Sequence, residues 1–187
     1  MANWKTLATK VVYKTPWIEI IENKVIRPDG QNGQYSYIKA INGAIIVPFQ
    51  KDLGQVLLIK EYKYPNQKYM YVFPSGGVDK DEEPIETARR EMKEEVNIEG
   101  IGLEWLGAFC SNSAIITDKI HVFVATFSSE EINKTNMSSV TGDTIINRRE
   151  WFPIGKVQEM IKKGEVVDGL SIVAFSYFCL HTGYTTK

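Results

Sequence analysis

A glycine pair followed by a carboxylate-rich helix constrains this chain more than any other feature, and both lie within residues 71–98. Gly76 and Gly77 permit a tight turn in which the backbone can come close to a ligand. Pro84 suits the first position of a helix that we expect to reach about residue 96. Apolar residues recur along that helix at spacings of three and four, which predicts one buried stripe: Ile85, Ala88, Met92 and Val96.

Three glutamates of the predicted helix, Glu91, Glu94 and Glu95, stand at positions i, i+3 and i+4 and should share one solvent-facing side. Carboxylates held this close repel one another, so the helix would tolerate them best with a cation among them. Mg²⁺ binds a few carboxylates together with waters and substrate phosphates. Arg90 can offset part of the repulsion. The alternative is an ordinary solvated acidic face with Glu–Arg pairs.

The spacing of the whole stretch resembles the Nudix box. The positions in register are Gly76, Glu82, Arg90, Glu91, Glu94, Glu95 and Ile98. The usual glycine near the end is Asn97 here, a residue that tolerates the left-handed conformation of helix ends. The resemblance implies a Nudix hydrolase that uses Mg²⁺, or Mn²⁺, to cleave a nucleoside diphosphate linked to another group. The products would be a nucleoside monophosphate and a phosphorylated remainder.

The resemblance also implies which groups hold the metal ion and the substrate. Glu91 and Glu95 would be direct ligands, with the Ser75 carbonyl completing the site. Glu94 would bind the ion directly or through water. The backbone at Gly76 and Gly77 would approach the substrate.

Further roles follow from the same resemblance. Arg90 would hold the carboxylates in place, with Glu82 as its structural partner. The attacking water needs a base, which would be Glu94 or an acid from the polar loop expected at residues 128–146. The loop candidates are Glu130, Glu131 and Asp143, of which Asp143 aligns best.

The order of elements predicts an α/β fold, and the resemblance implies a Nudix-type α/β/α sandwich with a mixed sheet at residues 43–187. Apolar runs at 43–49 and 55–62 read as central strands buried on both faces. Further strands are expected at 69–73, 105–110 and 120–127, and helices at 156–163 and 168–181. The buried face of the last helix is expected to hold Leu170, Val173, Ala174, Tyr177 and Phe178.

Residues 1–42 read as a small antiparallel β segment, because short β-branched and aromatic runs alternate with turn signals. Such a segment resembles the ADP-ribose pyrophosphatase branch of the family, in which it packs across a homodimer. The resemblance makes Trp17 and Tyr13 candidates for stacking on a base or for the interface. The alternative for each is a core aromatic.

Three departures from that branch bear on the substrate. The stretch KEYKYP resembles RQYRYP but has Lys63 at the usual arginine, which leaves either a phosphate contact without a bidentate fork or a surface lysine. Val72 replaces a glutamate, and Ser113 and Ala114 replace a Pro-Gly turn. These changes predict relaxed selectivity, and they keep open a second function, a Nudix-fold module that senses nucleotide sugars without turnover.

Composition excludes several other classes. The chain has 187 residues, of which 43% are hydrophobic and 24% charged, as in a globular domain with a real core. A formal net charge of −1 gives no sign of a nucleic-acid surface, so the expected partner is a small nucleoside-diphosphate-linked molecule. We find no signal peptide, membrane span or cysteine framework, and therefore expect a cytoplasmic enzyme without a membrane partner.

Overall fold

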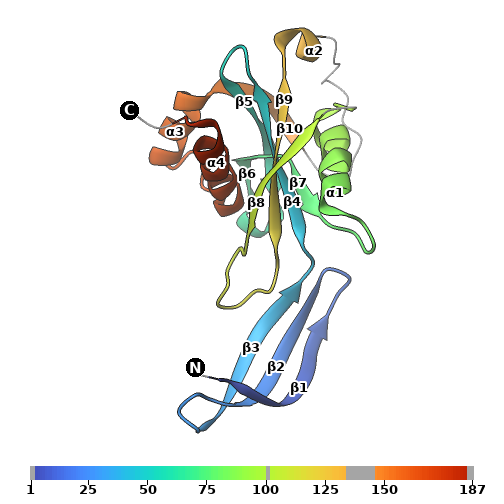
Figure 1. The fold of residues 1–187 in the computed structure, drawn as a ribbon, viewed down its shortest axis with the longest axis vertical. Coiled ribbons are helices and arrows are strands. Elements are labelled where there is room, and N and C mark those ends of the chain that lie inside the picture. The colour runs from blue at the N-terminus through green and yellow to red at the C-terminus, as the bar shows by residue number, and fades with distance from the viewer. Residues whose placement is uncertain (1–2, 100–101, 134–145, 185–187) are drawn as a thin grey trace. The chain divides into compact units, whose positions relative to one another are not determined.

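The computed structural model describes residues 3–99, 102–133 and 146–184, which fall into two compact units (Figure 1). One unit combines residues 1–42 with 109–119, and the other combines 43–108 with 120–187. The segment 109–119 therefore packs with the N-terminal strands, an association that the sequence did not indicate.

The N-terminal unit is built on three antiparallel strands in the order β1 (Lys5–Lys14), β2 (Ile18–Ile26) and β3 (Asn32–Ala40). The predicted small antiparallel sheet is thus confirmed. Ile21 and Val25 on the central strand are buried, because residues four apart lie on one face of a strand. Every residue of β1 is exposed, so this edge strand contributes little to the core of its own unit.

The segment 109–119 joins this unit through main-chain hydrogen bonds to β3. The Ile38 N–H donates to the Ile115 carbonyl at 2.7 Å, and the Thr117 N–H donates to the Ile38 carbonyl at 3.0 Å. A buried carboxylate shapes the same segment, since Asp118 accepts a hydrogen bond from the Ser111 N–H at 3.0 Å.

The larger unit contains a seven-stranded mixed sheet. Its strands are β4 (Gly43–Gln50), β5 (Gln55–Lys63), β6 (Lys68–Val72), β7 (Ser75–Gly77), β8 (Leu103–Phe109), β9 (Ile120–Phe127) and β10 (Ile146–Pro153). The order is β10-β5-β4-β9-β8, with β6 paired to β5 and β7 paired to β4. Strands β4 and β9 run parallel, whereas β5 runs antiparallel to β4, β6 and β10. Every residue of β4 is buried, as expected for a central strand.

Helices cover both faces of this sheet, with α1 on one side and α3 and α4 on the other (Figure 1). The helices are α1 (Pro84–Glu91), α2 (Ser129–Asn133), α3 (Ile154–Lys162) and α4 (Gly169–Thr182), with a 3₁₀ turn η1 (Tyr64–Asn66) and a π-helical turn η2 (Met92–Val96). The predicted α/β/α arrangement is confirmed. The stripe predicted on the first helix is buried at Ala88, Met92 and Val96, with Ile85 packed against the same core.

Some local expectations were wrong. Gly76 and Gly77 form the short strand β7, paired to β4, rather than a tight turn. The expected loop at 128–146 contains α2, and residues 134–145, which include the candidate Asp143, lie outside the described residues. Residues 146–153 form β10, which the sequence analysis did not predict.

Helix α4 begins at an Asp168 N-cap, whose carboxylate accepts hydrogen bonds from the Ser171 N–H at 2.8 Å and the Ser171 hydroxyl at 2.7 Å. The Ser171 oxygen in turn accepts from the Phe73 N–H at 3.0 Å. The predicted apolar face is correct at Ala174 and Phe178 and omits the buried Phe175. The remaining predicted face residues, Leu170, Val173 and Tyr177, are only half-buried.

Candidate active site

The carboxylate-bearing helix that the sequence predicted is an α-helix, α1, followed by a π-helical turn, η2. Helix α1 begins at Pro84, whose missing N–H costs nothing at a first helical position, and runs to Glu91. The next five residues form the π-helical turn η2, in which the Asn97 N–H reaches back to the Met92 carbonyl. Asn97 then ends the segment at φ 59°, in the left-handed region that asparagine tolerates. Turns of this kind are frequent at functional sites, because they re-aim the side chains around them.

The Glu91 carboxylate lies against the backbone of Gly76. A Cβ at that position would stand 1.7 Å from the nearer Glu91 oxygen, so only glycine leaves room for it. The same oxygen accepts a hydrogen bond of 2.6 Å from the Arg90 guanidinium. Burial raises the pKa of the Glu91 carboxyl, and the Arg90 charge offsets part of that rise.

Glu95 is the most buried acid of the segment, at 3% exposed, so the expectation that Glu91 and Glu95 face solvent is wrong. Its carboxylate accepts a hydrogen bond of 3.0 Å from the Ser75 N–H on β7. Burial raises the pKa of Glu95 to about 8, and the negative charge of Glu91 raises it further. A group held this way favours any cation that approaches it.

Arg90 links the acids around it. Its guanidinium lies 3.3 Å from each Glu82 oxygen and 3.5 Å from Glu94, and it donates to the Gly77 carbonyl at 3.1 Å. Burial alone would raise the pKa of the Glu82 carboxyl, but hydrogen bonds from Arg90 and Thr87 outweigh it and hold that pKa below its usual value. The expected Arg90–Glu82 partnership is therefore present as a contact.

Glu94 differs from its two neighbours. Its side chain remains 39% exposed, so it can meet water while Glu91 and Glu95 cannot do so freely. Among the described residues, its side chain pairs with Arg90 alone, at 3.5 Å. This position suits a group that acts on a water molecule, and its role as a base stays a prediction.

Strand β5 adds two charged side chains that face one another. The Lys63 ammonium lies 2.6 Å from the Glu61 carboxylate, and Glu61 is buried. The charges of both act on the pKa of Glu95, Glu61 raising it and Lys63 lowering it. The sequence analysis singled out Lys63 but missed Glu61, although an acid inside an otherwise apolar strand is itself a signal.

A second residue that the sequence analysis missed comes from β10. Arg149 stands opposite Ile59 of β5 and donates through Nε to the main-chain carbonyl of Glu95. Its guanidinium is half-buried, and burial lowers its pKa while the Glu95 charge acts in the opposite direction. The residue could not be placed from the sequence, because β10 itself was not predicted.

Other candidates do not join this group. Glu131 accepts from the N–H and hydroxyl of Ser128, at 2.7 and 2.8 Å, and so caps α2. Asp143 lies outside the described residues. Val72 is buried in the core on the α1 side of the sheet, where it pairs with Ile59, and offers no polar atom at the glutamate position.

The aromatic candidates of the N-terminal unit lie at its surface. Trp17 is 65% exposed and Tyr13 is 56% exposed, so the alternative that they are core aromatics is wrong for both. Trp17 borders a hollow of about 240 Å³ together with Lys14 and Lys39. Exposed aromatics next to lysines suit contact with a flat or anionic group, and that role stays a prediction.

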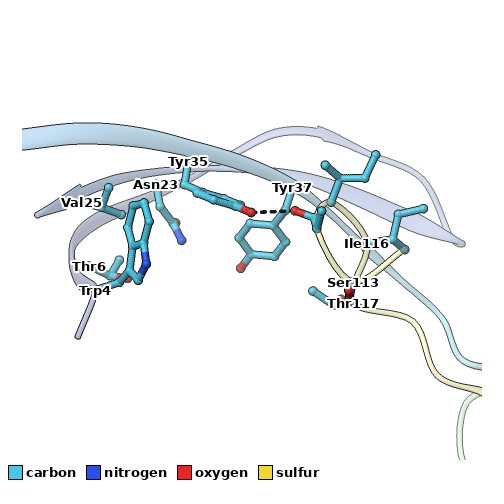
Figure 2. Close-up of a pocket in the computed structure, with 11 residues that line it drawn as sticks. Trp4, Thr6, Asn23, Val25, Tyr35, Tyr37, Ser113, Ile116 and Thr117 are labelled. Carbon is cyan, nitrogen blue, oxygen red and sulfur yellow. Dashed lines mark hydrogen bonds between the residues drawn. The ribbon is translucent and has the colours of Figure 1, made fainter. Parts of the chain in front are cut away.

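A larger hollow in the same unit involves aromatics that the sequence analysis did not single out (Figure 2). It encloses about 460 Å³ and is lined by Trp4, Thr6, Asn23, Val25, Tyr35, Tyr37 and residues 113–117. The Trp4 and Tyr35 rings pack edge to face, with their centroids 5.6 Å apart. The Tyr35 hydroxyl donates a hydrogen bond to the Ala114 carbonyl at 2.7 Å. The buried Asn23 Oδ1 has no hydrogen-bond partner among the described residues.

Comparison with known proteins decides the family. The NUDIX domain matches residues 40–170, and the nucleoside diphosphate sugar hydrolase N-terminal domain matches residues 4–38. The chain belongs to the Nudix family. It is a Nudix pyrophosphohydrolase, as the box predicted.

Several relatives of this Nudix chain span nearly its whole length. It is 25% identical to a methanol dehydrogenase activator of Bacillus methanolicus, over 98% of this chain and 96% of that protein. It is also 25% identical to an ADP-ribose pyrophosphatase of Bacillus subtilis, over 94% and 92%. A GDP-mannose pyrophosphatase of Yersinia enterocolitica is 27% identical over 75% and 74%. A solved ADP compounds hydrolase, 18% identical, superposes with a TM-score of 0.78 over 97% of both chains and confirms the fold.

The acids of the Nudix segment fit a hard divalent cation by their chemistry. Within the described ranges no three acidic, histidine or cysteine side chains converge on one point, so the fit rests on Glu91 and Glu95. Both are buried, both have raised pKa values, and Gly76 leaves the space that the Glu91 carboxylate uses.

Among the described helices none is long and apolar enough to cross a membrane.

Proposed function

We propose that this Nudix pyrophosphohydrolase uses Mg²⁺, or Mn²⁺, to hydrolyse the diphosphate of a nucleoside diphosphate joined to another moiety, of the ADP-ribose or sugar-nucleotide type. Water adds to one phosphorus as the bridging P–O bond breaks, which gives a nucleoside monophosphate and a phosphorylated product. The observation that carries this proposal is the buried pair Glu91 and Glu95, held beside β7 by Gly76 and Ser75. The ADP-ribose and GDP-mannose pyrophosphatases among its relatives support it.

Each residue has one task in this reaction. Glu91 and Glu95, with the Ser75 carbonyl, would hold the ion, and a divalent ion bound there would neutralise the diphosphate and activate water. Arg90 holds the carboxylates in place, because its guanidinium bonds to both Glu91 and Glu82. Glu94, the exposed acid of the three, accepts the proton of the attacking water, with a residue such as Asp143 as the other candidate base.

Substrate contacts are assigned to the larger unit at residues 63, 76 and 77 and, separately, to the exposed aromatics of the N-terminal unit. Lys63 meets a phosphate as a point charge once it leaves Glu61, and the backbone at Gly76 and Gly77 lies along the diphosphate. Trp17 and Tyr13, exposed on the N-terminal unit, stack on the base or lie at the interface of a homodimer. A cytoplasmic location agrees with two free cysteines, Cys110 and Cys179.

A substrate panel tests the proposal. ADP-ribose, ADP-glucose, GDP-mannose, a dinucleoside polyphosphate and a nucleoside triphosphate are incubated with Mg²⁺, and products are separated by chromatography. We expect a nucleoside monophosphate from at least one diphosphate-linked substrate, and none in EDTA or with Glu95→Gln. Absence of turnover from every member with wild-type protein would refute the proposed activity.

One observation favours a second candidate, a nucleotide-sugar sensor without turnover. Lys63 is already paired to Glu61, so its charge is partly neutralised within the protein. Val72 is buried in the core and provides no carboxylate at the position where relatives carry a glutamate. The likeness to a methanol dehydrogenase activator over nearly the whole chain is compatible with a regulatory role. Calorimetry with the same panel distinguishes the two, because a sensor would bind ligand with Mg²⁺ present and release no product.

A further inference from the structure

Arg149 connects the last strand of the sheet to the acidic helical segment. It lies on β10, which pairs with β5 at the edge of the larger sheet (Figure 1). The neighbouring Arg148 has a 62% exposed side chain and pairs with Glu150. Successive side chains of a strand point to opposite faces, so only Arg149 of the two reaches Glu95.

The Glu95 carbonyl that Arg149 contacts lies near the C-terminal end of the helical segment η2. The last carbonyls of a helical segment have no partner further along the helix and need donors from elsewhere. In η2 the Asn97 N–H goes to Lys93 and Met92, and the Ile98 N–H goes to the Met92 carbonyl at 3.1 Å. Arg149 supplies the donor for Glu95 and places a positive charge at the negative end of the segment.

This contact acts on the carboxylate through the backbone. The side-chain direction of Glu95 depends on where its own peptide group lies, and Arg149 holds that peptide group from the strand side. Ser75 holds the carboxylate from β7 at 3.0 Å. Glu95 is thus fixed at its main chain and its side chain by two different strands.

We propose that Arg149 is a positioning residue for the metal-binding acids: it fixes the Glu95 peptide group and thereby keeps the Glu95 carboxylate beside β7 and Glu91. The inference rests on the proposed metal-dependent hydrolysis. Arg149 touches neither substrate nor ion in this scheme. Its loss therefore weakens metal binding through Glu95 and leaves the substrate contacts of Lys63 in place.

The test compares Arg149→Met, Arg149→Lys and the matched control Arg148→Met. Mn²⁺ binding is measured by electron paramagnetic resonance without substrate, and kcat and KM follow at saturating metal. We expect Arg149→Met to weaken Mn²⁺ binding about tenfold or more with KM for substrate changed less than threefold. Arg149→Lys should recover part of the loss, and Arg148→Met should stay within twofold of wild type. Equal Mn²⁺ affinities for Arg149→Met and wild type would overturn the proposal.

Two further measurements separate positioning from a general loss of structure. In the Glu95→Gln background Arg149→Met should have no additional effect on Mn²⁺ binding, since the carboxylate it positions is gone. Amide hydrogen exchange in EDTA should accelerate at Asn97 and Ile98 in Arg149→Met and remain slow elsewhere in the sheet. Unchanged exchange at these two amides refutes the positioning role even if the protein turns over no nucleotide.

Discussion

Glu95 carries a carboxylate into a region from which water is nearly excluded. Desolvation of a charge is costly unless a cation or several donors compensate it. Here the Ser75 N–H is a single neutral donor, and Glu91 and Glu61 add like charge. The residue is therefore unfavourable for folding and favourable for binding a cation, which is the usual relation between stability and function at such sites.

The first prediction concerns Glu95→Gln. The folded pKa of about 8 lies above the usual 4.5, so the folded state holds this proton more tightly than the unfolded state. The metal-free protein consequently loses stability as pH rises between these values, and the loss is complete above about 8. We expect Glu95→Gln to raise the free energy of unfolding in EDTA at pH 9 by a few kcal/mol and at most about 5 kcal/mol, because each pKa unit between 4.5 and about 8 corresponds to roughly 1.4 kcal/mol, and to abolish turnover.

The control is Glu86→Gln, an exposed acid of α1 paired to Arg89, which should change neither quantity. Chemical denaturation at pH 5 and pH 9 checks the sign. A Glu95→Gln protein less stable than wild type at pH 9 would contradict the assigned cost of the charge.

A second prediction concerns Gly76→Ala. The new methyl group would meet the Glu91 carboxylate at 1.7 Å, so the carboxylate must move away from β7. We expect a loss of more than tenfold in kcat/KM and in Mn²⁺ affinity, with the fold retained by circular dichroism. Gly155→Ala, where nothing lies within 4 Å, should leave all three unchanged. Wild-type Mn²⁺ affinity in Gly76→Ala would remove Glu91 from the metal site.

A third prediction concerns selectivity. Lys63 replaces a bidentate arginine and is paired to Glu61, and such charged hydrogen bonds contribute roughly 1.5–3 kcal/mol. Discrimination of about ten- to a hundredfold is lost with them, at 1.4 kcal/mol per decade. We expect kcat/KM for ADP-ribose to exceed that for ADP-glucose or GDP-mannose by less than about a thousandfold. A larger ratio would mean that other contacts replace the missing ones.

At the scale of elements, the end of η2 offers a fourth prediction. Asn97 stands at φ 59°, where a β-branched residue is strained by roughly 1–2 kcal/mol and glycine is not. Asn97→Val should therefore destabilise the protein by about that amount, whereas Asn97→Gly should be neutral or slightly stabilising. Denaturant unfolding of the two variants is the measurement, and an equal effect of both would contradict the assigned conformation.

Most elements could be predicted from periodicity, and the failures have identifiable physical causes. The buried stripe of α1 and the runs of β4, β5 and β9 follow from burial, which the sequence encodes directly. Strand β10 was missed because Arg148, Arg149 and Glu150 break its apolar alternation, and the contacts of Arg149 with Glu95 and of Glu150 with Tyr71 join residues far apart in the sequence. The same limit applies to the burial of Glu91 and Glu95, since their acidity alone suggests exposure.

At the scale of the molecule, β1 is an edge strand of the N-terminal sheet, and no strand among the described residues pairs with its outer edge. Its exposed side chains include Leu7, Val11, Val12 and Tyr13, each at least 49% accessible. An edge strand of ten residues with apolar side chains is a template for pairing with another chain. Its exposure agrees with the expected homodimer, which stays a prediction.

The fifth prediction tests that assembly. Light scattering at micromolar concentration should give twice the monomer mass. Val11→Asp and Val12→Asp each place a charge on the exposed apolar part of this edge strand, so at least one of them should release the monomer. A wild-type monomer, or no effect of either variant, would contradict a dimer built on this strand.

The π-helical turn η2 also limits which insertions and deletions this segment of the enzyme can accept. A π turn holds its hydrogen bond across one residue more than an α-helical turn, as the Asn97-to-Met92 contact does here. Deleting one residue such as Lys93 would let the segment relax into an α-helical turn, and this relaxation offsets most of the roughly 100° rotation that a deletion causes in a regular α-helix. Inserting one more residue has no such release, and it would turn Glu95 away from Ser75 or Val96 out of the core. Single-residue insertions, which surface loops absorb easily, should therefore be excluded from this segment in functional variants of the enzyme, whereas deletion of Lys93 should be tolerated better.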